Sequence, residues 1–172
     1  MYLIWAQHSQ EEDWGLILSD ARNEDNWIAM LWGVPHECPS GAQFTINCYR
    51  RWATLVVRDT EYRSGHFLYI KEGVTQGGTL ALISYVIGVL PLTIELGDTH
   101  PRITQPWYAD DVGKEGKLGH IMEHSQDLHA RGTLWGYFLE PTNSILVVDL
   151  RNVARAEEFF HSMGINIVAG GC

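Results

Sequence analysis

Short apolar runs alternate with helix-like stretches along the chain, and no internal repeat, low-complexity tract or Pro/Ser-rich linker interrupts them. Apolar and β-branched runs bounded by turn residues predict strands at residues 14–19, 54–57, 66–70, 103–108, 144–148 and 165–168. Helical spacing predicts helices at residues 23–32, 42–52, 79–96, 118–130 and 153–163. Helices laid on one face of a mostly antiparallel sheet give an α+β fold.

Turn residues between these elements predict where the chain reverses. Two prolines and a Ser-Gly pair within residues 35–41 are expected to break the helical pattern. Tyr-Arg-Ser-Gly at residues 62–65 lies between two β-rich runs and predicts a hairpin. A second hairpin is expected at residues 103–117, with a tight turn at Ala109 and Asp110.

One uncharged segment, residues 73–94, raises the question of a membrane span. Its first part is polar and Gly-rich, and the apolar part from Leu80 to Leu92 contains Gly88 and Pro91. That part is shorter than the roughly 20 apolar residues that a spanning helix requires. We therefore expect a buried helix and no membrane association.

Composition indicates one domain that does not bind nucleic acid by charge alone. A chain of 172 residues with 45% hydrophobic residues has room for one core, so we expect a single domain over residues 1–172. Twelve Lys and Arg against 21 Asp and Glu give a formal charge of -9. This charge opposes an unassisted grip on a phosphate backbone, so divalent cations or a basic partner would have to help.

The cysteines and the N-terminus indicate an intracellular protein. The three cysteines are Cys38, Cys48 and Cys172, an odd and scattered set that suggests neither a disulfide framework nor a zinc knuckle. Residues 1–5 run straight into an acidic stretch, without the basic region that opens a secretory signal. We therefore expect a reducing, intracellular setting, with nucleus and cytoplasm not distinguished.

Candidate chemistry centres on three aspartates. Asp20 follows an apolar strand, and Asp110 and Asp111 lie in a tight turn between two predicted strands. Two-metal nucleotidyl transfer needs carboxylates that hold Mg²⁺ ions about 3.5–4 Å apart. A strand ending in Asp beside a turn that presents two more would form such a site, whereas an isolated Asp-Asp pair is usually a solvated turn.

The order of four segments along the chain favours a metal site over a solvated turn. The segments are Leu16–Asn23, Glu72–Gly77, Trp107–Asp111 and Glu140–Val147, and the third contains Tyr-Ala-Asp-Asp at residues 108–111. In this order they resemble the palm motifs of reverse transcriptases, and they are most similar to the retrotransposon type. The third is the most specific, because it is similar to the Tyr-x-Asp-Asp box.

The resemblance implies a polymerase palm with a ferredoxin- or RRM-like antiparallel sheet and RNA-directed DNA polymerase activity. It implies that Asp20, Asp110 and Asp111 are catalytic and bind Mg²⁺ or Mn²⁺. The residues it places at the substrate are Ala21, Asp25, Gln76, Gly77 and Tyr108. The implied partners are an RNA or DNA template-primer, a deoxynucleoside triphosphate, and domains that supply fingers and a thumb.

Three positions depart from the family pattern. Asp25 stands where similar sequences carry an aromatic residue, and the Gly-Thr pair at 78–79 replaces Asp or Cys followed by Pro. Asn143 stands where similar sequences carry a Lys thought to protonate pyrophosphate, and Asn has no acidic proton to give. We also expect incomplete fingers and no thumb. A non-catalytic palm remnant that binds a cation, nucleic acid or a partner chain is therefore the alternative, and whether the chain is an enzyme stays open.

A different motif offers another interpretation. His120, Glu123 and His124 have the H-x-x-E-H spacing of inverzincin metalloproteases, with both histidines on one face of a predicted helix. A zinc site would need a further ligand. Eight histidines make an accidental match easy, so the sequence favours incidental histidines on a solvated helix over a zinc hydrolase.

Overall fold

The computed structural model describes most of the chain, which divides into two compact units. The described residues are 8, 11–22, 34–49, 53–58, 65–70, 81–108 and 111–170. The larger unit comprises residues 1–22 and 92–172, and the smaller unit comprises residues 23–91. That both belong to one domain, as the chain length predicts, stays a prediction.

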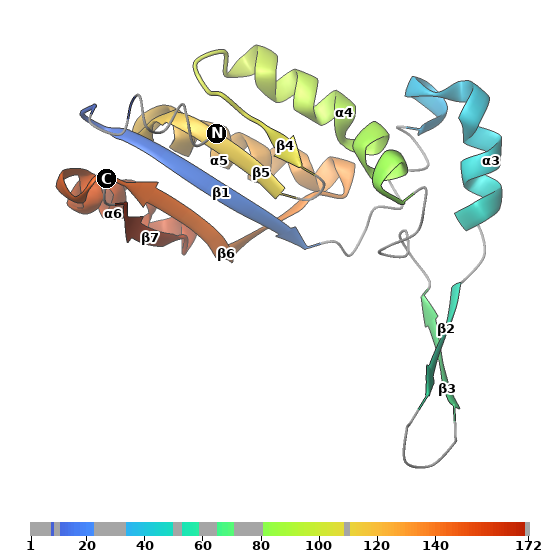
Figure 1. Ribbon diagram of the computed structural model, residues 1–172. Coiled ribbons are helices and arrows are strands. Elements are labelled where there is room, and N and C mark those ends of the chain that lie inside the picture. The colour runs from blue at the N-terminus through green and yellow to red at the C-terminus, as the bar shows by residue number, and fades with distance from the viewer. Residues whose placement is uncertain are drawn as a thin grey trace. The chain divides into compact units, whose positions relative to one another are not determined.

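A five-stranded sheet forms the larger unit, with the strand order β4-β5-β1-β6-β7 (Figure 1). The strands are β1 (Trp14–Arg22), β4 (Trp107–Tyr108), β5 (Asp111–Lys117), β6 (Phe138–Val148) and β7 (Asn166–Ala169). The central strand β1 is antiparallel to both β5 and β6, and β4 is antiparallel to β5. Only the β6–β7 pair among the described strands is parallel, so the mostly antiparallel sheet is confirmed.

Two helices, α5 (Leu118–Gly132) and α6 (Val153–Phe160), cover one face of this sheet (Figure 1). The residues of α5 that are buried recur at helical spacing, which gives the helix one core-facing stripe. The core between helices and sheet includes Ile17, Leu118, Ile121, Leu146, Val148, Ala156 and Phe160. This layer of helices on a sheet is an α+β arrangement.

The pleat of β1 separates a core face from an open face. Ile17, Ser19 and Ala21 are buried on the side of the helices. Because side chains alternate along a strand, Leu18 and Asp20 point to the other side, where Leu18 is 45% exposed. We call the side that bears Leu18 and Asp20 the open face.

Strand β6 is longer than the sequence predicts. A strand was expected at 144–148, but β6 begins at Phe138, so Glu140 to Asn143 also lie within it. The register with β1 shifts here, since Leu18 pairs with Ile145 and Asp20 pairs with Glu140. The intervening residues form a bulge that interrupts the ladder, and this explains why a strand can contain Pro141.

The smaller unit contains a helix, a hairpin and part of a second helix. The elements are α3 (Pro39–Tyr49), β2 (Ala53–Arg58), β3 (Gly65–Ile70) and α4 (Ala81–Thr99), which continues into the larger unit after Pro91. Pairing of β2 with β3 confirms the predicted hairpin. None of the described helices combines the length and the apolar character that crossing a membrane requires.

Some predicted boundaries differ from the observed ones. The predicted break within residues 35–41 is shorter than expected, because residues 34–37 are helical and only Cys38 interrupts the helices. The next helix, α3, begins at Pro39 and not at Ala42, and proline is well suited to a first helical turn. The helix predicted to reach Met163 ends at Phe160 and continues as a 3₁₀ turn. The helix predicted at residues 23–32 lies outside the described residues.

The core face also carries a buried amine. Lys114 of β5 is fully buried and lies opposite Ile17 of β1. Its Nζ donates a hydrogen bond to Oγ of Ser125 at 3.1 Å. Burial lowers the pKa of Lys114 to about 7, because desolvation disfavours the charged form. The folded protein therefore binds this proton more weakly than the unfolded chain does.

This difference predicts a pH-dependent stability. Because the pKa of Lys114 is lower in the folded state, the free energy of unfolding should rise as pH increases from about 7 toward 10.5. Between pH 7 and pH 9 we expect a gain of about 2 kcal/mol that K114M lacks. Urea denaturation of both proteins at several pH values measures it. K117M, which removes an exposed lysine of the same strand, is the control, and equal slopes for wild type and K114M would contradict the prediction.

Candidate functional site

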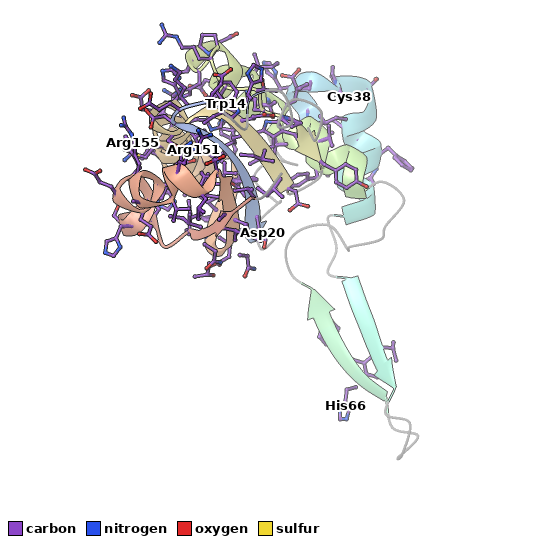
Figure 2. All side chains as sticks on the ribbon, turned by 60° about the vertical axis from the view of Figure 1, so that its left-hand side comes forward. Trp14, Asp20, Cys38, His66, Arg151 and Arg155 are labelled. Carbon is purple, nitrogen blue, oxygen red and sulfur yellow. The ribbon has the colours of Figure 1, made fainter. Side chains whose placement is uncertain are left out.

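Asp20 lies on the open face near one end of β1, and Trp14 lies at the other end of the same strand (Figure 2). Its neighbours Ser19 and Ala21 are anchored in the core, so the alternation of the strand directs the Asp20 carboxylate away from the helices. The side chain is half-buried. β1 continues to Arg22, so the predicted strand is confirmed but does not end at the aspartate.

Asp111 is the first residue of β5 and is exposed. The β1–β5 register ends at the pair of Ser19 with Val112, and Asp20 and Asp111 are the next residues along the two strands. Because side chains alternate along a strand, both carboxylates are on the face opposite to Ser19 and Val112. Two carboxylates from distant parts of the chain therefore lie at the same end of the open face.

The turn before Asp111 is consistent with the predicted hairpin. Tyr108 of β4 pairs with Asp111 of β5, which leaves two residues, 109 and 110, to connect the strands. Asp110 itself lies outside the described residues. The side chain of Tyr108 is 78% exposed, at the end of β4 next to the connection to β5.

Strand β6 places two more polar side chains beside Asp20. Glu140 pairs with Asp20, so a second carboxylate lies beside it on the strand across from β5. Asn143, in the bulge, donates a hydrogen bond from Nδ2 to Oδ2 of Asp20 at 2.9 Å. No spacing along the sequence predicts this contact, because it depends on the bulge in β6.

Hydrogen bonds fix the bulge on both sides. Ser144 Oγ accepts from the backbone N–H of Asp20 at 3.2 Å and donates to the backbone oxygen of Glu140 at 2.9 Å. Asn166 of β7 donates from Nδ2 to the backbone oxygen of Thr142 at 2.6 Å. The Thr142 hydroxyl donates to Glu140 Oε1 at 2.7 Å. The surroundings of Asp20 are thus held by side chains from two strands.

The remaining residues expected at the substrate divide into two groups. Ala21 is buried on the core face, so it can line a pocket on the open face only through its backbone. Asp25, Gln76 and Gly77 lie outside the described residues. Their predicted roles stay predictions.

The carboxylate pair has the donor chemistry that a hard divalent cation requires. Mg²⁺ prefers oxygen ligands in near-octahedral geometry and is often bound through one or two carboxylates, with water completing the shell. Asp20 and Asp111 supply two such groups on an accessible face. No three His, Cys, Asp or Glu side chains within the described ranges form a group that could hold a metal ion. The fit therefore rests on this pair, and the three-aspartate site stays a prediction.

The fold is shared with a telomerase. The structure of apo telomerase from Candida tropicalis, truncated from its C-terminal domain, matches with a TM-score of 0.55 and 13% sequence identity. The match covers 83% of this chain but 32% of the telomerase chain, so this chain spans about a third of its length. No protein-family model and no curated protein sequence matches. At this identity the likeness shows the fold alone.

The H-x-x-E-H residues occupy different environments on α5. His124 is fully buried, and its Nε2 lies 2.9 Å from Oε1 of Gln105. His120 is partly exposed, and it lines a pocket of about 400 Å³ together with Glu123 and Arg102. Burial is the largest cause that lowers the pKa of His124 to about 3, and the positive charge of Lys114 adds to it. The neutral imidazole of His124 is thus packed in the core and already has a partner.

The buried imidazole predicts a loss of stability in acid. Because the pKa of His124 is about 3 in the folded protein and near 6.5 when exposed, the unfolded chain binds the extra proton first as pH falls. Between pH 7 and pH 5 we expect this residue to cost about 2 kcal/mol of the free energy of unfolding. H124L should not show that component, whereas H129L, an exposed histidine of the same helix, should retain it. Urea denaturation at pH 7 and pH 5 measures the free energy of unfolding of each protein. An equal loss of stability in H124L and wild type would contradict the assignment to His124.

Proposed function

We propose that this chain is the palm of a reverse-transcriptase-related polymerase, and that Asp20, Asp111 and the adjacent Asp110 bind Mg²⁺ or Mn²⁺ for nucleotidyl transfer. The observation that carries the proposal is the β1–β5 register, which ends at Ser19 and Val112 and so leaves Asp20 and Asp111 as the next residues along two neighbouring strands. The fold shared with telomerase, a reverse-transcriptase-related polymerase, supports it at a coarse level. The order of the four sequence motifs and the Tyr-Ala-Asp-Asp segment support the retrotransposon-type assignment.

The aspartates have a defined role in this proposal. When bound, the cations would activate the attacking hydroxyl and stabilise charge on the leaving oxygen. Asp20 and Asp111 would hold them from two adjacent strands, each one residue beyond the last pair of the ladder, Ser19 with Val112. Their exposed face gives a triphosphate access to the same point. Tyr108, exposed beside Asp111, is available for contact with a nucleotide.

The substrates proposed for this site are a template-primer of RNA or DNA and a deoxynucleoside triphosphate. Gln76, Gly77, the backbone of Ala21 and Asp25 are proposed to line the nucleotide pocket. The formal charge of -9 makes the chain a poor binder of polyphosphate backbones by itself. We therefore propose that partner domains supply the basic contacts of fingers and thumb.

Divalent cations should bind weakly to the chain through the paired aspartates. Titration calorimetry with Mn²⁺ should show one weak binding process that depends on these carboxylates. Both D20N and D111N should lower the Mn²⁺ affinity by at least about 10-fold, because removing a metal ligand should cost at least as much affinity as removing a residue that orients a ligand. D98N, an exposed aspartate on α4, is the matched control and should bind as wild type does. Identical binding isotherms for wild type, D20N and D111N would remove the metal site and with it the proposed function.

Primer extension by the 172-residue chain alone should be close to background. Net negative charge weakens template-primer binding, and Asn143 cannot supply the general acid whose contribution is typically ~10²–10⁴-fold. A primed RNA template with labelled nucleotide and Mn²⁺ measures this, with D111N as the inactive reference. Readily detected extension that D111N abolishes would contradict the expected weakness while supporting the polymerase assignment. Cation binding without extension, even when basic fingers and a thumb are fused to the chain, would favour the non-catalytic remnant.

A further inference from the structure

We propose that Asn143 is a positioning residue for Asp20, which holds one carboxylate oxygen so that the other faces the cation. The inference rests on the proposed function, because it concerns the same carboxylate. Its basis is the hydrogen bond from Nδ2 of Asn143 to Oδ2 of Asp20, 2.9 Å long and made between residues far apart in sequence. Similar sequences carry a lysine at this position, so the sequence alone presents Asn143 as the loss of a proton donor. The observed hydrogen bond indicates a different role, which is to orient Asp20.

The bulge of β6 is what brings Asn143 to Asp20. In a regular ladder Leu18 and Asp20 would face β6 residues two apart, but they face Ile145 and Glu140. The extra residues of β6 at the bulge allow the exposed side chain of Asn143 to reach the half-buried carboxylate of Asp20. A bulge of this kind re-aims a side chain, and bulges are frequent beside active sites.

The bulge also holds Asn143 in place through its neighbours. On one side, Ser144 is buried and its hydroxyl joins the backbone of Asp20 to that of Glu140. On the other side, Asn166 fixes the backbone oxygen of Thr142. Because both residues that flank Asn143 are held, the amide meets Asp20 in a preformed geometry.

A neutral donor suits this position better than a cation does. The carboxylate of Asp20 can accept about four hydrogen bonds or metal contacts, and Asn143 takes one of them on Oδ2. Oδ1 and the remaining lone pairs stay available to a cation, and the amide adds no positive charge that would repel it. An ammonium group at the same distance would compete with the cation for the carboxylate.

The test is Mn²⁺ affinity, measured from the electron paramagnetic resonance signal of free Mn²⁺ during titration of the full chain. N143A should bind Mn²⁺ about 10-fold more weakly, the lower end of what losing a group that orients a metal ligand costs. N143K should weaken binding at least as much, and N143Q, which keeps an amide donor, should recover most of the affinity. Q126A, which removes an exposed amide from α5, is the matched control and should bind as wild type does.

The outcomes separate this inference from the function on which it rests. If wild type binds Mn²⁺ through Asp20 but N143A binds equally well, the positioning role is wrong and the metal site stands. If N143Q is as weak as N143A while both unfold at the wild-type urea concentration without metal, the amide donor is not what matters, and the inference is also overturned. If wild type does not bind Mn²⁺, both the inference and the proposed function fall.

Discussion

Pairing of β1 with strands on both of its sides is the constraint on which the rest of the larger unit depends. The β1–β5 and β1–β6 ladders decide which residues of β1 face the helices. A slip of one residue would bury Asp20 and expose Ile17, since side chains alternate along a strand. Gly15 helps to fix the register, because a Cβ there would lie 2.8 Å from Cδ2 of Leu118. The position of the aspartate is thus a consequence of packing on the opposite face.

The core beneath the candidate site is unusually polar, and this limits how stable it can be. Lys114 is fully buried, and the hydroxyl of Ser19 is buried without a hydrogen-bond partner among the described residues. Nδ1 of His124 is likewise buried without a partner there. Burial of a polar group costs free energy unless the group is hydrogen-bonded, and burial of a charged group costs more. The lowered pKa values of Lys114 and His124 are the response to that cost, because both groups discharge more easily than they would in water.

Local patterns predicted the regular elements, and long-range pairing decided the remainder. The apolar run of β1, the helix α5 and the β2–β3 hairpin could be predicted from short windows, because each depends on neighbours a few residues away. The course of residues 140–143 could not, since Pro141 argues against a strand unless the bulge in β6 is known. The same holds for the site. The Asp20 and Asp111 motifs were visible in the sequence, whereas the Asn143 contact required the shifted register.

The open face combines an acidic end with an apolar remainder, and this decides how nucleic acid could approach it. Asp20 and Glu140 pair at one end, with Asp111 on the neighbouring strand, while Leu18 and Ile145 are exposed next to them. Lys117 lies at the opposite end of β5 from Asp111, and the backbone of β1 continues from Asp20 to Arg22. A phosphate near Asp20 would meet the like charge of these carboxylates. Cations held by the aspartates are therefore what would make this end of the sheet attractive to a polyphosphate, so the same ions would serve binding as well as chemistry.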